Sequence, residues 1–199
     1  MRTATVLLLA LALAGAASAA DELIVTELMY NSINDANGDD VEWIELYNAG
    51  GATLDLTGWT LTDDDATHDA MALSGTMAPG EVMLVVGDEA QFNLQYPDVT
   101  NYFPVYFVAS WALGNGGDGV QIFDGSGNVV FAFAFDDASP WPEACDGDGP
   151  SLLLMNTGCT DFSDAGCWTT GEDWGTPGVL TQTVGDEETS FGALKAMFR

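Results

Sequence analysis

The sequence predicts an all-β protein, a sandwich of about eight or nine short strands. Two observations carry this prediction. Short runs of apolar and β-branched residues recur along the chain and are separated by Gly, Pro, Asn and Asp, which favour turns. Two of these runs flank Asp124-Gly125-Ser126-Gly127-Asn128, a strong hairpin signal because glycine tolerates positive φ. No internal repeat of roughly 20 to 50 residues is visible.

The expected elements of the first half are short strands at residues 23–29, 41–47, 70–73 and 82–86, with an extended segment at 54–61. The run at 41–47 is rich in β-forming apolar residues and ends at a turn. Glu42 and Glu45 fall on opposite faces of this strand because side chains alternate, so we do not expect them to act as an acid/base pair. Trp59, in the extended segment, is expected in the core.

One internal segment, residues 88–96, has the spacing of a short helix. Asp88 can cap its N-terminus, Phe92 and Tyr96 recur four residues apart, and Pro97 ends it. We expect this helix to plug one end of the sandwich.

The second half of the chain continues the pattern of strands. Residues 103–111 are aromatic but interrupted by Pro104, which favours an edge strand or an extended crossover. Phe131, Phe133 and Phe135 recur at period 2, so their shared face is expected in the core. The remaining expected elements are the hairpin strands at 120–123 and 129–135, a strand at 152–155 and an irregular segment at 156–178.

The charge of the chain is strongly one-sided, with 31 Asp and Glu against 3 Lys and Arg and a formal net charge of −28. No Lys or Arg occurs between Asp21 and Leu194. Nucleic acid and anionic membranes are disfavoured as partners because their phosphates would be repelled. Two interpretations of the acidity remain, a surface suited to a salty environment and specific Ca²⁺ sites.

The N-terminus has the pattern of a secretory signal peptide, which we place at residues 1–20. Arg2 precedes an apolar run at 6–14 and the small residues Ala17-Ser18-Ala19. No later stretch is long enough for a transmembrane helix. The sequence therefore predicts a secreted protein, extracellular or at the cell surface.

The C-terminus is expected to hold a linker at 179–188 and a short amphipathic tail at 189–199. Lys195 and Arg199 suit the C-terminal end of a tail helix. The tail is either a frayed end or a docking or sorting peptide.

The chain has an odd number of cysteines, Cys145, Cys159 and Cys167. Cys159 and Cys167 lie close together in a polar, glycine-containing loop, which favours a local disulfide. Pairing of Cys145 with either of them stays open, and one thiol should be left over unless it pairs with another chain. None has the spacing of a catalytic cysteine.

One acidic loop has the features of a Ca²⁺ site. Asp35, Asn37, Asp39 and Glu42 offer oxygen ligands at nearly alternate positions around Gly38. The alternative is a solvated turn, which Asn, Asp and Gly favour on their own account. Weaker candidates are two further acidic groups: Asp63-Asp64-Asp65 with Asp69, and Asp146 with Asp148.

The sequence does not predict an enzyme, and we assign no catalytic residue. His68 is the single histidine, no nucleophile-elbow pattern is present, and we expect this side chain to be solvated. One His and three scattered Cys do not make a zinc site. Trp141 and Trp174, in loops, could be exposed and form a carbohydrate platform.

Several motifs together resemble the lamin tail domain, the immunoglobulin-like module at the end of nuclear lamins that also occurs in secreted bacterial proteins. The motifs occur in the family's order over roughly residues 23–178, at 26–31, 42–48, 54–61, 77–81, 113–118, 149–152 and 175–178. In the family, the last motif, Gly175-Thr176-Pro177-Gly178, closes the domain.

The resemblance implies an immunoglobulin-like β-sandwich over residues 21–178. It implies a non-catalytic module for binding, adhesion or cell-surface structure, with a protein or glycan as partner. The alternative is an accessory domain of an extracellular hydrolase or nuclease system. Filament assembly is not implied, because the chain has no heptad rod.

Overall fold

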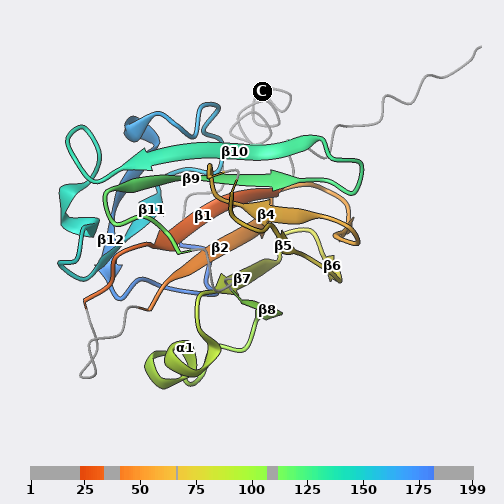
Figure 1. Cartoon of the computed structure of the whole chain (residues 1–199), viewed down its shortest axis with the longest axis horizontal. Coiled ribbons are helices and arrows are strands. Elements are labelled where there is room, and N and C mark those ends of the chain that lie inside the picture. The colour runs from red at the N-terminus through yellow and green to blue at the C-terminus, as the bar shows by residue number, and fades with distance from the viewer. Residues whose placement is uncertain (1–22, 34–40, 66, 107–111, 182–199) are drawn as a thin grey trace, which may run out of the picture.

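Two β-sheets are stacked as the layers of a sandwich (Figure 1). The computed structural model describes residues 23–33, 41–65, 67–106 and 112–181, without the side chains of 104–106. In these residues the larger sheet has the order β12-β11-β1-β2-β7-β8, the smaller has the order β10-β9-β4-β5, and β3 pairs with β6. The predicted all-β sandwich is confirmed.

The described strands are β1 (Leu23–Met29), β2 (Trp43–Asn48), β3 (Leu54–Asp55), β4 (Thr60–Thr62), β5 (Met71–Ala72), β6 (Thr76–Met77), β7 (Val82–Val86), β8 (Tyr102–Tyr106), β9 (Gly117–Phe123), β10 (Val129–Asp136), β11 (Pro150–Leu154) and β12 (Trp168–Asp173). The helices are α1 (Glu89–Gln95) and the 3-10 helices η2 (Glu143–Cys145) and η3 (Ala165–Cys167). There are more strands than we expected because the extended segment at 54–61 divides into β3 and β4, and because β6 and β12 were not predicted.

The central strands β1 and β2 are buried along their whole length. One face packs on the smaller sheet through residues such as Leu28 and Ile44, and the other face carries Met29 and Trp43 in a second apolar cluster. A strand covered on both faces needs apolar residues on both, which explains why apolar and polar residues alternate poorly in β2.

The hairpin of β9 and β10 forms as predicted, around Asp124 to Asn128. Phe131, Phe133 and Phe135 are buried, whereas Ala132 and Ala134 between them are exposed. These phenylalanines face the larger sheet and fill the space between the layers. Trp59 is buried in the same core, as predicted.

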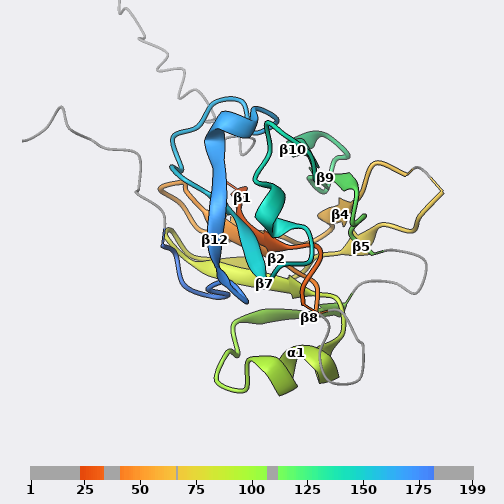
Figure 2. The ribbon, with the colours of Figure 1, turned by 90° about the vertical axis from the view of Figure 1, so that its left-hand side faces the viewer.

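Helix α1 forms where predicted but lies in a different place. Asp88 caps it, accepting a hydrogen bond from the Gln91 N–H at 2.9 Å. The helix does not plug an end of the sandwich. It covers the outer face of the larger sheet (Figure 2), where Phe92 packs with Trp43 and Leu84. The reason is that this face of the sheet is also apolar and needs a cover.

Of the two edge strands of the larger sheet, one was predicted from the sequence and the other was not. β8 is an edge strand that pairs parallel to β7, as expected of the aromatic segment with Pro104. β12 was not expected, because residues 156–178 looked irregular. This strand is mostly polar, and only Trp168 at its start is buried, so it lacks the apolar pattern of the inner strands.

Candidate functional site

Two glutamates, Glu27 of β1 and Glu45 of β2, lie side by side inside the protein. They are directly opposite each other in the antiparallel ladder, beside an irregularity in register, and both are 0% exposed. Glu45 shares a face with Trp43, two residues before it, so the pair lies on the outer face of the larger sheet. The fold therefore buries two carboxyl groups at adjacent positions.

Glu27 accepts three hydrogen bonds. Its Oε1 accepts one from Ser151 Oγ at 2.5 Å and one from the Thr176 N–H at 3.0 Å. Its Oε2 accepts a third from Thr176 Oγ1 at 2.7 Å. Glu27 thus joins β1 to β11 and to the segment that follows β12.

Glu45 lies next to two hydrogen-bonding groups. Its Oε1 is 2.7 Å from Thr26 Oγ1, and its Oε2 accepts a hydrogen bond from the Gly178 N–H at 2.9 Å. The second carboxyl therefore binds the same C-terminal segment, two residues further on.

Residues 174–180, which we call the strap, lie on the outer face of the larger sheet. Tyr96 Oη donates to the carbonyl oxygen of Trp174, and Asn101 Nδ2 donates to that of Gly178 at 3.3 Å. A Cβ atom at Gly175 would lie 2.7 Å from both Glu27 Oε1 and Trp43 Cζ2. Only glycine allows such a close approach, and its φ of 68° suits glycine as well.

Burial dominates the electrostatics of the pair. Loss of solvation raises the pKa of Glu45 to about 8 and also raises the pKa of Glu27, against the effect of the hydrogen bonds from Ser151 and Thr176. The described residues contain no Lys or Arg that could compensate a buried negative charge. One of the two carboxyls must therefore be neutral near neutral pH.

The pair has no access to a substrate. Its acceptors are occupied by the fold, and both side chains are sealed by the strap. A hollow of about 200 Å³ lies beside the strap and is lined by Leu153, Thr170, Gly171, Glu172, Thr176 and Thr181, without either glutamate. The arrangement is suited to holding the strap rather than to acid/base chemistry.

Most of the predicted Ca²⁺ loop lies outside the described residues. This applies to Asp35, Asn37 and Asp39. Glu42 is described and half-buried, and its Oε2 accepts a hydrogen bond from the Leu113 N–H at 3.1 Å. The Ca²⁺ site therefore stays a prediction.

The second acidic loop is folded around its own side chains. Asp63 is buried, and its two oxygens bind the Asp65 N–H and His68 Nδ1. This bond to Asp63 raises the pKa of His68, so the histidine is not simply solvated as expected. Asp65 in turn binds Thr67, whereas Asp69 is exposed.

The third acidic pair does not converge. Asp146 accepts a hydrogen bond from Asn31 Nδ2 at 2.5 Å, and Asp148 is exposed. Among the residues that the structure describes, no three His, Cys, Asp or Glu side chains are grouped so that they could hold a metal ion.

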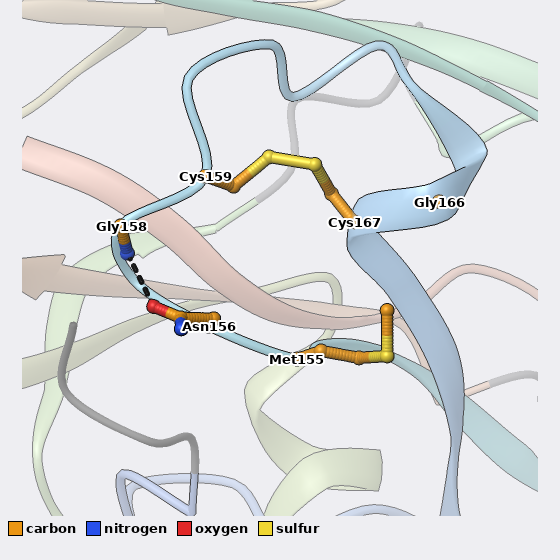
Figure 3. A pocket seen from close by; sticks show the side chains of 6 residues that line it. All are labelled: Met155, Asn156, Gly158, Cys159, Gly166 and Cys167. Carbon is orange, nitrogen blue, oxygen red and sulfur yellow. Dashed lines mark hydrogen bonds between the residues drawn. A yellow bond between two sulfur atoms is a disulfide. The ribbon is translucent and has the colours of Figure 1, made fainter. Parts of the chain in front are cut away.

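Cys159 and Cys167 form a disulfide, and Cys145 is a free, buried thiol. Burial raises the pKa of Cys145 to about 11, so this thiol is a poor nucleophile. The disulfide lines an open hollow of about 220 Å³ together with Met155 and Asn156, whose Oδ1 accepts a hydrogen bond from the Gly158 N–H (Figure 3).

Trp141 and Trp174 do not form an exposed platform. Both are half-buried. Trp141 packs against the core at Trp168, with ring centroids 6.4 Å apart, and Trp174 packs in the outer cluster with Trp43. Both loops fold back onto the sandwich, because large aromatic rings are stabilised by burial.

Sequence reasoning missed the buried carboxyl pair. The sequence brings Glu45 close only to Glu42, whereas its partner in the fold is Glu27 on the neighbouring strand. One signal was available, because Glu27 is the only charged residue in the largely apolar run Leu23 to Met29. A charge in a strand buried on both faces requires a partner.

Comparison with known proteins gives one match. The family model described as Lamin Tail Domain matches residues 16–136, more than half of the 199 residues of the chain. No curated protein and no solved structure matches the chain.

Proposed function

Because the chain belongs to the lamin tail domain family, we propose that it is an exported, non-catalytic module for binding, adhesion or cell-surface structure. The family match confirms the resemblance seen in the sequence, and the sandwich agrees with the immunoglobulin-like fold of the family. Since such folds carry many functions, the proposal depends on the residues of this chain.

The observation that carries the proposal is that the buried acidic side chains are hydrogen-bonded to other parts of the fold. In the described residues, the buried acidic side chains are Glu27, Glu45 and Asp63. Each is bonded to neighbouring groups of the fold, the glutamates to the strap and Asp63 to its own loop. Acids that hold the fold together are not free to transfer protons to a substrate.

Two features support export. The N-terminal pattern is that of a signal peptide, which we place at residues 1–20. The Cys159–Cys167 disulfide fits an oxidising compartment, since such bonds are rare in the cytosol. No helix in the described part of the chain is long and apolar enough to cross a membrane.

The partner we propose is a protein or a glycan at the cell surface. The acidic composition, with a net charge of −28, disfavours nucleic acid. A protein partner would present basic residues, whereas a neutral glycan would not depend on charge. Salt therefore distinguishes the two, because screening weakens binding between opposite charges.

We also propose that Ca²⁺ stabilises the protein through Asp35, Asn37, Asp39 and Glu42. Ca²⁺ should then raise the melting temperature above that of a chelated control, and deletion of residues 35–40 should abolish the rise. An equal melting temperature of the wild type with Ca²⁺ and with chelator excludes the site.

The function is tested with the purified exported chain in a binding screen against cell-surface glycans and proteins, at low and high salt. We expect saturable binding to at least one of them without turnover. The alternative, an accessory or hydrolytic role, predicts cleavage of a polysaccharide or nucleic acid. Cleavage that His68→Gln abolishes would overturn the proposal.

A further inference from the structure

The strap is attached to the sheet through the two glutamates. Thr176 contributes its N–H and hydroxyl to Glu27, and Gly178 contributes its N–H to Glu45. At its ends the strap is held by neutral groups, through Tyr96 Oη at Trp174 and Asn101 Nδ2 at Gly178. Burial raises the pKa of Tyr96 above its usual value, so the two carboxyls are the acids among these contacts that ionise first as the pH rises.

The surroundings of the pair cannot stabilise two negative charges. Glu27 and Glu45 are adjacent and fully buried, and like charges at this separation repel strongly in a dry interior. Glu27 has three donors, including a backbone N–H, and is the better place for one charge. Glu45 is then the group that holds a proton.

The proton has a place in the observed geometry. Glu45 Oε1 is 2.7 Å from Thr26 Oγ1, and a hydroxyl can accept as well as donate. A protonated Oε1 can donate to Thr26 while Oε2 accepts from the Gly178 N–H. The neutral acid therefore keeps both of its contacts.

We propose that Glu27 and Glu45 form a proton-operated latch, which holds the strap on the sheet while one carboxyl is protonated and releases it when both are ionised. This inference goes beyond the proposed function, because it does not depend on what the module binds. Release would expose the buried pair to water and lengthen the connection between the sandwich and the residues after the strap.

The other acid near the pair acts in the same direction, because the charge of Glu172 of β12 also raises the pKa of Glu27. The phenol of Tyr96, which follows α1, is neutral, and its pKa is raised chiefly by burial and also by the charge of Glu27. Opposite Glu45, β7 presents the apolar Leu84. β1, β2, β7, β11 and β12 contain no Lys, Arg or His, so no described cation near the pair opposes release.

Hydrogen exchange of the strap measures the latch directly in the full exported chain. Exchange of the amides of 174–180 is followed at about pH 6 and pH 9, each corrected for the intrinsic rate. We expect protection to fall about tenfold at the higher pH, one unit above the pKa of Glu45 near 8. The amides of β9 and β10 should keep their protection.

Two variants serve as references, Glu45→Gln for the closed strap and Gly175→Ala for the open strap. Glu45→Gln imitates the neutral acid, since its amide can donate to Thr26 and accept from Gly178, so its strap should stay protected at both pH values. Gly175→Ala places a Cβ 2.7 Å from Glu27 Oε1 and should leave the strap open at both. Glu143→Gln, which removes a charge from an exposed site, should behave like the wild type.

The results that overturn the latch are specific. Equal strap protection in the wild type at both pH values would show that ionisation does not open it. If Glu45→Gln folds and still loses protection at about pH 9, another group is responsible. If that variant does not fold, constant protection in the wild type remains sufficient to reject the proposal.

Discussion

Glu45 is a carboxyl group inside a β-sheet, on a strand where most neighbours are apolar. Burial of a lone ionised carboxylate is very costly, and proteins avoid the cost by pairing the charge or by keeping the proton. The described residues offer Glu45 no cation, but they offer a hydroxyl and a backbone N–H. Both groups donate to Glu45 and favour its ionised form, but loss of solvation outweighs them and favours the neutral acid.

Stability should therefore depend on the protonation of Glu45. Its folded pKa of about 8 lies above the unfolded value of 4.5, so its contribution is complete below 4.5 and is lost as the pH rises towards 8. Because one proton is involved, the free energy of unfolding should fall by up to about 1.4 kcal/mol for each pH unit. Urea unfolding between these pH values should show this slope in the wild type and a weaker one in Glu45→Gln.

Exposed acids also repel each other more as the pH rises, so a control is required. Glu143→Gln removes one exposed charge and should keep the wild-type slope. Parallel slopes for Glu45→Gln and the wild type would contradict the neutral state of Glu45.

The sequence identified the residues of this buried site but did not show which of them contact each other. Glu27, Glu45 and Thr176 all lie within motifs that could be recognised. Their meeting depends on the register of β1 and β2, which contains an irregularity, and on a strap more than a hundred residues further along the chain. Neither follows from local spacing.

Among the elements, β10 contributes most visibly to the core between the sheets. Phe133 stacks on Trp168 of β12, with ring centroids 4.8 Å apart and planes at 16°, and also contacts Phe131 and Phe135. The strand thus joins the smaller sheet to the edge of the larger one.

Phe133→Ala should lower the free energy of unfolding by about 3–5 kcal/mol, because it removes a buried ring and leaves a cavity. Ala132→Ser changes the adjacent, exposed position and should stay within about 0.5 kcal/mol of the wild type. Chemical unfolding measures both. Similar losses for the two variants would mean that β10 does not face the core as described.

The disulfide secures the loop between β11 and β12. This loop places Phe162 on Phe131, with ring centroids 4.8 Å apart, and its Ser163 Oγ accepts a hydrogen bond from the Ala134 N–H. The loop is thus packed against β10.

Replacing both Cys159 and Cys167 by Ala should cost roughly 2–3 kcal/mol, the loop-closure value for a separation of 8 residues. A reductant should lower the melting temperature of the wild type to that of the double variant. It should leave the variant itself unchanged. No effect of either treatment would show that the loop packs without the bond.

The elements that could be predicted are those whose packing requires a recognisable pattern of apolar, turn or capping residues in the sequence. β1, β7 and the β9–β10 hairpin follow from apolar runs and turn residues, and α1 follows from its cap and Pro97. β12 is polar on its exposed side and gives no such pattern. The position of α1 depends on the apolar outer face of the larger sheet. Because the central strands are apolar on both faces, their sequences do not show which face is the outer one.

For the whole molecule, charge is the dominant property. With a net charge of −28 and no described Lys or Arg, the folded state concentrates like charges that are further apart in the unfolded chain.

The sandwich was predictable from strand number and turn spacing, because these constrain the layers. The strap was not, since its contacts are polar and distant in sequence.

Salt should stabilise the protein by screening this repulsion. Raising NaCl from about 0.05 to 1 M should raise the melting temperature steadily, and KCl should do the same, which separates screening from a specific Na⁺ effect. A melting temperature that does not change with either salt would contradict the importance of the surface charge.

The central claim is that the two buried glutamates are structural, with one of them neutral. Carbon-13 NMR of glutamate carboxyl groups in the folded protein tests it most directly. We predict one carboxyl that titrates near pH 8 and whose signal is absent in Glu45→Gln. If every glutamate carboxyl titrates below about pH 6, both buried acids are ionised at neutral pH and the claim is wrong.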